Sequence, residues 1–217
     1  MNQVKQILLI VIAAVGLIAC DDSSYATDFQ YNMVTFISNE GGMSYEYQGY
    51  EDSPVIQLYD SEVISLLEDS GERIMLQYTE LGVVNGVQQI STIGYSSVIN
   101  DVLRESDMET INKVDISPMV LNSIWRTGNY ININCQLLYT GAVRQFQLVM
   151  DKATASDEIV ECYLIDNTMS VTTYYYRKAF AAFNVEAIWT SATCQTLRIY
   201  IVEKDNGQQY YDFTKTN

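Results

Sequence analysis

The chain has 217 residues, of which 48% are hydrophobic, and its 12 basic and 27 acidic residues give a net charge of −15. This composition is typical of a globular protein, and the negative charge argues against nucleic-acid binding because phosphate backbones would be repelled. Histidine is absent, which excludes the Ser-His-Asp triad, the Cys-His dyad and histidine-bound zinc.

The first residues have the pattern of an export signal. One cation, Lys5, precedes the apolar run Ile7–Ile18, which is too short to remain as a membrane-spanning helix. The following Ala19-Cys20 completes a sequence that resembles the bacterial lipobox. The resemblance implies cleavage between Ala19 and Cys20 and a diacylglyceryl group on the Cys20 thiol. An ordinary secretory signal with an unmodified cysteine is the alternative.

The first half of the mature chain alternates apolar and polar residues, as strands do. We expect strands over 32–37, 43–48, 55–59, 72–79 and 89–99, with one short helix over 61–68. Asn85-Gly86 predicts a tight hairpin, because these residues tolerate positive φ at both central positions. So many short strands in about 75 residues predict a small OB-like barrel.

The second half predicts a separate antiparallel sandwich. Residues 100–115 are charged and mixed, so we place the domain boundary there. Alternation then predicts strands over 130–139, 143–150, 159–165, 194–202 and 209–214. Two segments stay open: 171–176 fits a strand or a loop, and 179–186 fits a helix or a strand. The predicted fold class is all-β.

These patterns divide the chain into four parts. We expect a signal peptide over 1–19, a lipidated tether over 20–31, a barrel domain over 32–113 and a sandwich domain over 114–217.

Three cysteines remain beside Cys20, namely Cys135, Cys162 and Cys194. An odd number allows at most one disulfide within the chain. Cys135 shares the parity of the apolar residues around it, so its side chain is expected in the core. We interpret all three as buried thiols that pack like small hydrophobic residues, and we leave their disulfide state open.

Motifs that would indicate an enzyme are absent from the sequence. It contains no glycine-rich phosphate loop, no nucleophile elbow and no histidine-based metal motif, and Asp205-Asn206-Gly207 begins like a calcium loop but is interpreted as a hairpin turn, so we expect no cofactor and no metal site. Glu46, Glu72 and Glu80 lie on or beside expected strands and could form a hydrolytic carboxylate pair, although we favour the explanation that they lie on a solvated outer face. The 17 tyrosines, including Tyr174–Tyr176, could stack on sugars or simply form strands.

Charge is distributed unevenly along the chain. Residues 21–103 contain 14 acidic residues and a single basic one, Arg73. We favour solubility and repulsion from an anionic surface as the reason for this charge. The functional alternative is bound divalent cations or a cationic partner, for which a cationic peptide or an envelope protein is the candidate.

Three features of the sequence resemble the NigD-like lipoproteins of gram-negative anaerobes. They are the lipobox at Cys20, the strand Glu72–Thr79 and, above all, the stretch Ile124–Ile133 with its Trp-x-x-Gly-x-Tyr-apolar-Asn pattern. The resemblance extends over nearly all of the mature chain. It implies an N-terminal OB-like domain and a C-terminal β-sandwich. The family name implies a bacteriocin-immunity role, and the resemblance supplies no catalytic residues.

Our leading hypothesis is a non-enzymatic binding or immunity-type protein, held by its N-terminal lipid at the outer membrane. The sequence leaves open which membrane face it occupies, and its oligomeric state. The alternative is a glycan-binding accessory lipoprotein that uses exposed tyrosines. A carboxylate-based hydrolase is the third hypothesis.

Overall fold

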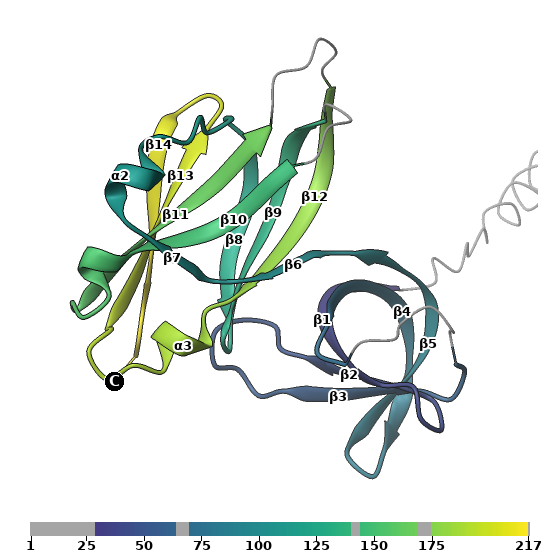
Figure 1. Ribbon diagram of the computed structural model, residues 1–217. Coiled ribbons are helices and arrows are strands. Elements are labelled where there is room, and N and C mark those ends of the chain that lie inside the picture. Colours follow the sequence, from purple (N-terminus) through teal and green to yellow (C-terminus); the bar gives the residue numbers. More distant parts are fainter. Residues whose placement is uncertain (1–28, 64–69, 140–143, 169–174, 217) are drawn as a thin grey trace, which may run out of the picture.

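The computed structural model describes residues 29–63, 70–139, 144–168 and 175–216, which form a barrel beside a two-sheet sandwich (Figure 1). The predicted signal peptide, Ala19, Cys20 and most of the tether lie outside the described residues, as does most of the helix predicted over 61–68. No helix in the described ranges is long and apolar enough to cross a membrane.

The N-terminal part is a closed barrel of five strands in the order β1-β2-β3-β5-β4, with β4 pairing back onto β1. The strands are β1 (Gln30–Ser38), β2 (Met43–Tyr47), β3 (Ile56–Asp60), β4 (Arg73–Val84) and β5 (Val87–Ser97). Their alternation turns every second side chain inward. Val34, Phe36, Tyr45, Leu76 and Tyr78 are among the residues that fill the barrel. The predicted small barrel is thereby confirmed.

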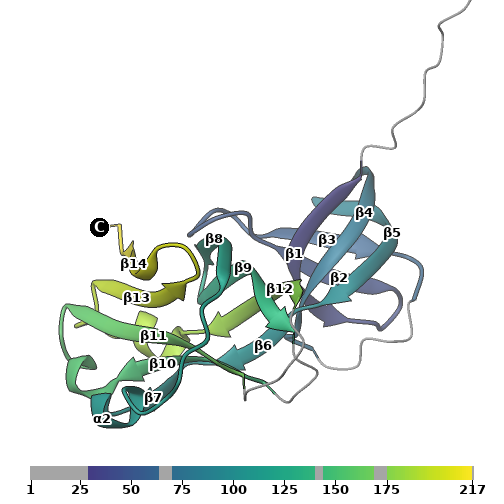
Figure 2. The same cartoon turned by 90° about the horizontal axis from the view of Figure 1, so that it is seen from above.

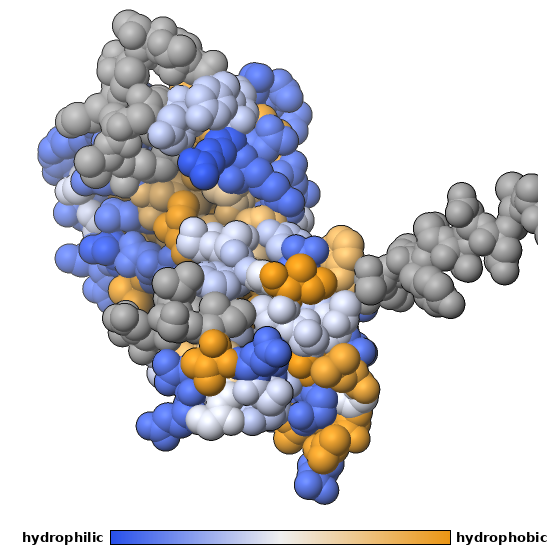
Figure 3. All heavy atoms as spheres, turned by 90° about the vertical axis from the view of Figure 1, so that its right-hand side faces the viewer, coloured by the Kyte–Doolittle hydropathy of each residue, from blue (hydrophilic) through white to orange (hydrophobic). Residues whose placement is uncertain are grey.

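The hairpin predicted at Asn85-Gly86 is confirmed as well. Asn85 has φ +53° and Gly86 has φ +83°, which is the backbone that a two-residue turn with the strand twist requires. The hairpin of β4 and β5 extends below the barrel and carries the exposed side chains of Leu81, Val83 and Val84. Hydrophobic residues accordingly gather at the lower end of the barrel in Figure 3.

The C-terminal part consists of two sheets. One has the strand order β14-β13-β11-β10-β7 and the other β6-β12-β9-β8. Their strands are β6 (Ile99–Val102), β7 (Arg104–Ser106), β8 (Val120–Thr127), β9 (Tyr130–Tyr139), β10 (Arg144–Asp151), β11 (Ile159–Thr168), β12 (Tyr175–Asn184), β13 (Thr196–Glu203) and β14 (Gly207–Thr214). In the part of this half that the structure describes, three short helices accompany them: α2 (Met108–Ile111), η1 (Lys152–Thr154) and α3 (Glu186–Trp189).

The two sheets enclose one large apolar core. Ile131, Ile133, Leu148, Phe183 and Leu197 are among its buried members. Cys135, Cys162 and Cys194 are also buried in this core, and no disulfide joins any of them. The sandwich and the interpretation of these cysteines as buried thiols are therefore confirmed.

The segment 100–115 forms more structure than its composition predicts. β6 pairs in parallel with β12, β7 pairs in parallel with β10, and β11 pairs in parallel with β13. Among the described strands, the pairs of the sandwich are thus antiparallel apart from these three. β6 and β7 precede residue 114 yet belong to the sandwich sheets, while the residue limits of the two domains stay a prediction. The ambiguous segment 179–186 continues β12 to Asn184 and only then turns into α3.

An apolar layer joins the barrel to the sandwich. Met33 and Met75 on the outside of the barrel pack in one cluster with Ala182, Trp125 and Phe180 of the sandwich. Seen from above, β6 and β12 lie on the side of the sandwich that faces the barrel (Figure 2). The two parts therefore share a continuous buried contact.

Two buried arginines strengthen this contact. Both terminal nitrogens of Arg126, on β8, donate hydrogen bonds to the Asp52 carboxylate, with lengths of 2.9 and 2.7 Å. The Arg126 guanidinium also lies 4.4 Å from the centre of the Trp189 ring. Arg73 of β4 lies 4.7 Å from the centre of the Tyr130 ring, and burial lowers its pKa to about 10. Each arginine thus connects a barrel element to a sandwich element.

Candidate functional site

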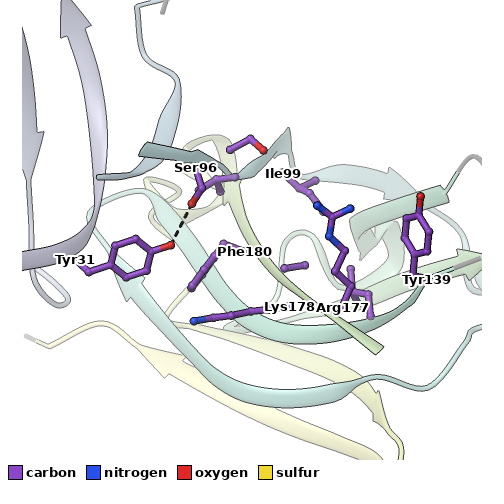
Figure 4. Close-up of a pocket in the computed structure, with 11 residues that line it drawn as sticks. Tyr31, Ser96, Ile99, Tyr139, Arg177, Lys178 and Phe180 are labelled. Atoms are coloured by element: carbon purple, nitrogen blue, oxygen red, sulfur yellow. Dashed lines mark hydrogen bonds between the residues drawn. The ribbon is translucent and has the colours of Figure 1, made fainter. Parts of the chain in front are cut away.

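A groove of about 470 Å³ lies at the junction of the barrel and the sandwich. Tyr31 of β1 lies at one end and Tyr139 of β9 at the other, with Arg177, Lys178 and Phe180 of β12 between them (Figure 4). The remaining lining residues are Ser96, Ser97, Val98, Ile99, Leu137 and Ala179. Ligand sites in proteins often occupy such junctions, so this groove is the candidate functional site.

The charge of the groove is opposite to that of the whole chain. Its lining contains two cations, Arg177 and Lys178, and no acidic residue, although the net charge of the protein is −15. The Lys178 ammonium lies 4.7 Å from the centre of the Phe180 ring, and the Arg177 guanidinium lies 5.7 Å from the centre of the Tyr139 ring. Neither cation has an ion-pair partner among the salt bridges of the described residues.

The alternation of β12 explains how this lining arises. Lys178 and Phe180 lie on the face of the sheet that carries Ala182, which packs against the barrel. Arg177 lies on the opposite face, together with Ala179. On the barrel side, the Tyr31 hydroxyl shares a hydrogen bond of 3.1 Å with the Ser96 hydroxyl. This bond fixes a ring in the wall that faces Lys178, whose ammonium lies 5.9 Å from the centre of the Tyr31 ring.

A second hollow of about 280 Å³ continues the groove past Tyr31, Lys178 and Phe180, which line both spaces. Trp125, Asn134 and Met75 line this smaller part. An indole ring therefore lies beside the candidate site.

Tyrosine rings gather at two places on the sandwich. Tyr139 and Tyr175 are 41% and 57% exposed, and their ring centres lie 5.0 Å apart at the Tyr139 end of the groove. On the other sheet, the ring centres of Tyr163 and Tyr200 lie 4.9 Å apart, and Tyr210 follows at 6.0 Å. Of the predicted run 174–176, Tyr174 lies outside the described residues, and Tyr176 packs near Lys204 rather than in the groove.

The three glutamates considered for catalysis lie outside the groove lining. Glu46 on β2 accepts a hydrogen bond of 2.9 Å from Gln57, as a solvated cross-strand pair does. Glu80 is exposed on β4, and Glu72 directly precedes that strand. In the ranges that the structure describes, no group of three or more acidic or cysteine side chains is arranged to hold a metal ion.

Sequence reasoning did not single out the groove residues. Tyr31, Ser96 and Lys178 are far apart in the chain and meet only because the barrel and the sandwich pack together. The one local signal was the succession of rings and cations from Tyr175 to Lys178.

Neither a family model nor a curated protein sequence matches this chain. Solved structures do match its fold. A protein of unknown function from Bacteroides vulgatus aligns with a TM-score of 0.72 at 14% identity, covering 87% of this chain and 92% of that one. A protein named as a candidate lipoprotein from Bacteroides fragilis aligns with a TM-score of 0.64 at 10% identity, covering 88% and 99%.

A NigD-like immunity protein from Bacteroides caccae aligns with a TM-score of 0.60 at 14% identity, covering 88% of this chain and 98% of that one. Identities this low establish the fold alone. The resemblance carried by Ile124–Ile133 is therefore confirmed in its structural part, and the chain has the barrel-and-sandwich fold of a NigD-like immunity protein.

Proposed function

We propose that this protein is a lipid-anchored envelope protein with a non-enzymatic, immunity-type role, and that it binds its partner in the groove between barrel and sandwich. The observation that carries the proposal is the groove itself, where Arg177 and Lys178 meet the exposed ring of Tyr139 within an acidic protein. Tyrosine and arginine side chains at the centre of a contact are among those that typically supply most of its binding energy.

The solved structures support this proposal through the names they bear. One is a NigD-like immunity protein, another is named as related to a toxin, and a third as a candidate lipoprotein. A membrane anchor at Cys20 fits the last of these. Outer-membrane location is part of the proposal, and the membrane face is left open.

The positive charge of the groove lining narrows the class of partner that we expect. A cationic peptide matches the acidic surface of the barrel, but Arg177 and Lys178 would repel it from the groove. An envelope or toxin-like protein that presents an acidic segment matches the groove better.

Glycan binding is the second candidate, and the exposed pair Tyr139 and Tyr175 favours it. Aromatic rings at the mouth of a groove can stack on the apolar face of a sugar.

Photocrosslinking in living cells tests the groove directly. A photoreactive amino acid replaces Tyr139 in the groove or Tyr210 on the far sheet, two exposed tyrosines in different places. We expect a discrete crosslinked species from position 139 only, and its loss in the double variant Arg177→Glu, Lys178→Glu. Lys113→Glu, at an exposed lysine on the other side of the sandwich, is the control for charge. Equal products from both positions, or products unchanged by the double variant, would contradict the proposal.

A survival assay tests the immunity role. Cells without the gene are exposed to antibacterial proteins released by neighbouring strains. The wild-type gene is expected to restore survival, whereas Cys20→Ser and the double groove variant are not. If the double groove variant restores survival, the immunity role does not depend on the groove.

A further inference from the structure

One edge of β12 is only half covered. In the order β6-β12-β9-β8, β6 is the only described strand next to this edge, and it pairs with Ala181–Asn184 alone. On its other side β12 pairs with β9 along its whole length, from Tyr175 to Asn184. Among the described strands, residues 175–180 therefore have a partner on one side only. Figure 1 shows β12 rising beyond β6 with this edge turned toward the barrel side.

The backbone bonds at the end of β12 identify the groups that face this edge. The Asn184 carbonyl accepts a hydrogen bond of 2.9 Å from the Leu103 amide, which follows β6. The backbone groups of the next residue point to the opposite side of the strand, because the Val185 amide donates a hydrogen bond of 2.8 Å to the Asn129 carbonyl, which lies beside β9. In an antiparallel strand, the N–H and C=O of one residue point to the same side, and the side alternates along the strand. The backbone groups of Tyr176 and Lys178 therefore point to the uncovered edge.

The groove runs along this same edge. Arg177–Phe180 form one wall, and Ser96–Ile99, where the chain leaves the barrel and enters β6, form the other. Ile99 pairs with Ala181, so the two segments lie side by side at that point and separate toward Lys178. The space of about 470 Å³ between them lies where a further strand would continue the line of β6.

We propose that the groove binds an extended acidic segment of the partner protein, which adds as a strand to the Tyr176–Phe180 edge of β12. The inference rests on the proposed function and names the chemistry of its ligand. Backbone hydrogen bonds to Lys178 hold the segment, and side chains give it specificity.

Charge complementarity selects the occupant. Successive side chains of an added strand point to opposite faces. Neighbouring acidic residues would therefore meet Lys178 on the face toward Tyr31 and Arg177 on the face toward Tyr139. Lysine also protects exposed strand edges against random pairing. Here it would reject neutral and basic strands and accept an acidic one.

The test uses a labelled, end-capped hexapeptide, Thr-Val-Glu-Asp-Val-Thr, titrated into the purified protein with fluorescence anisotropy as the readout. Trp125 fluorescence in the variant Trp189→Phe reports whether the groove is the site, since these are the two tryptophans of the chain. We expect the peptide to bind at least tenfold more tightly than the same peptide with two lysines or two glutamines at its centre. Its affinity is expected to fall with added salt.

Two variants separate the backbone from the charge. Lys178→Ala removes the cation but keeps the amide, whereas Lys178→Pro removes both. Proline is tolerated at an edge position whose N–H does not pair within the sheet, so Lys178→Pro is expected to fold. We expect Lys178→Pro to bind about tenfold more weakly than Lys178→Ala, as the loss of one backbone hydrogen bond predicts.

N-methylated peptides give a second measurement that needs no variant. A methyl group on an amide that pairs with β12 should abolish binding, and one on the next amide along should leave it. Equal binding by both methylated peptides, or by Lys178→Pro and Lys178→Ala, would overturn strand addition. Preference for the lysine or glutamine peptide would overturn the acidic ligand. If crosslinking at position 139 still captures a partner, the groove remains the binding site and only the strand model fails.

Discussion

Arg126 and Asp52 form an ion pair whose two partners differ in their exposure to solvent. The Arg126 side chain is 3% exposed, whereas that of Asp52 is 64% exposed. Hydrogen bonds from Arg126 lower the pKa of the Asp52 carboxyl below its ordinary value. Because the folded pKa lies below the unfolded one, the ion pair stabilises the fold above about pH 4 and loses this effect as the pH falls through the folded pKa.

Asp52→Asn is therefore expected to lower the free energy of unfolding by about 1–2 kcal/mol near neutral pH, since buried Arg126 loses its anion. Solvent around Asp52 keeps the loss below that of a fully buried pair. Urea unfolding at about pH 7 and about pH 2.5 measures the difference between variant and wild type, which should shrink at the lower pH. Glu109→Gln is the control, because its partner Lys113 is exposed. A loss of equal size at both pH values would contradict the argument.

The buried cysteines predict a thiol count. Burial raises the pKa of both Cys162 and Cys194, and Cys135 is fully buried. A thiol reagent reacts with the thiolate, so the native protein should show no reactive thiol among these three. In urea the mature protein should show three thiols if Cys20 carries lipid and four if it does not. Fast reaction of the native sandwich would contradict the buried positions.

At the scale of elements, the β4–β5 hairpin depends on its turn. Gly86 has φ +83°, a conformation that costs an L-residue about 1 kcal/mol. Gly86→Ala should therefore lower the free energy of unfolding by about that amount, whereas Asn85→Gly should leave it within about 0.5 kcal/mol. Thermal unfolding of both variants measures the difference. Two unchanged variants would show that this turn does not limit stability.

The elements that the sequence predicts well are those set by local patterns. Alternation over 130–139 identifies β9, and Asn85-Gly86 identifies the hairpin. β6 and β7 escape prediction because each is three or four residues long and lies in a charged segment. Their parallel partners, β12 and β10, lie far along the chain, and no local pattern encodes such a pairing.

The groove could not be predicted for the same reason. Tyr31 and Lys178 meet only through the apolar layer between barrel and sandwich. Sequence alone could find the rings and cations near Tyr175, but not the uncovered edge beside them, because that edge exists only where β6 leaves β12.

At the scale of the whole molecule, the layer between barrel and sandwich should make the protein unfold as one unit. Met33 and Met75 of the barrel pack against Ala182 and its aromatic neighbours, and the Arg126–Asp52 pair crosses the same junction. Two domains that share buried apolar area and a buried arginine lose both when either unfolds. The groove also depends on this coupling, since its two walls belong to different parts.

Met75→Asp is expected to divide the single unfolding transition into two. A buried charge at the junction costs several kcal/mol. Because Met75 lies outside both domain cores, each domain should keep its own core. Calorimetry of the wild type should give equal calorimetric and van't Hoff enthalpies, as a two-state protein does, and that equality should fail in the variant. Met75→Leu keeps the volume and should retain one transition. If the junction couples the two parts, Met75→Asp should also abolish peptide binding in the groove at temperatures where both domains are still folded. One transition in Met75→Asp, with binding intact, would show that each domain holds its groove wall without the other.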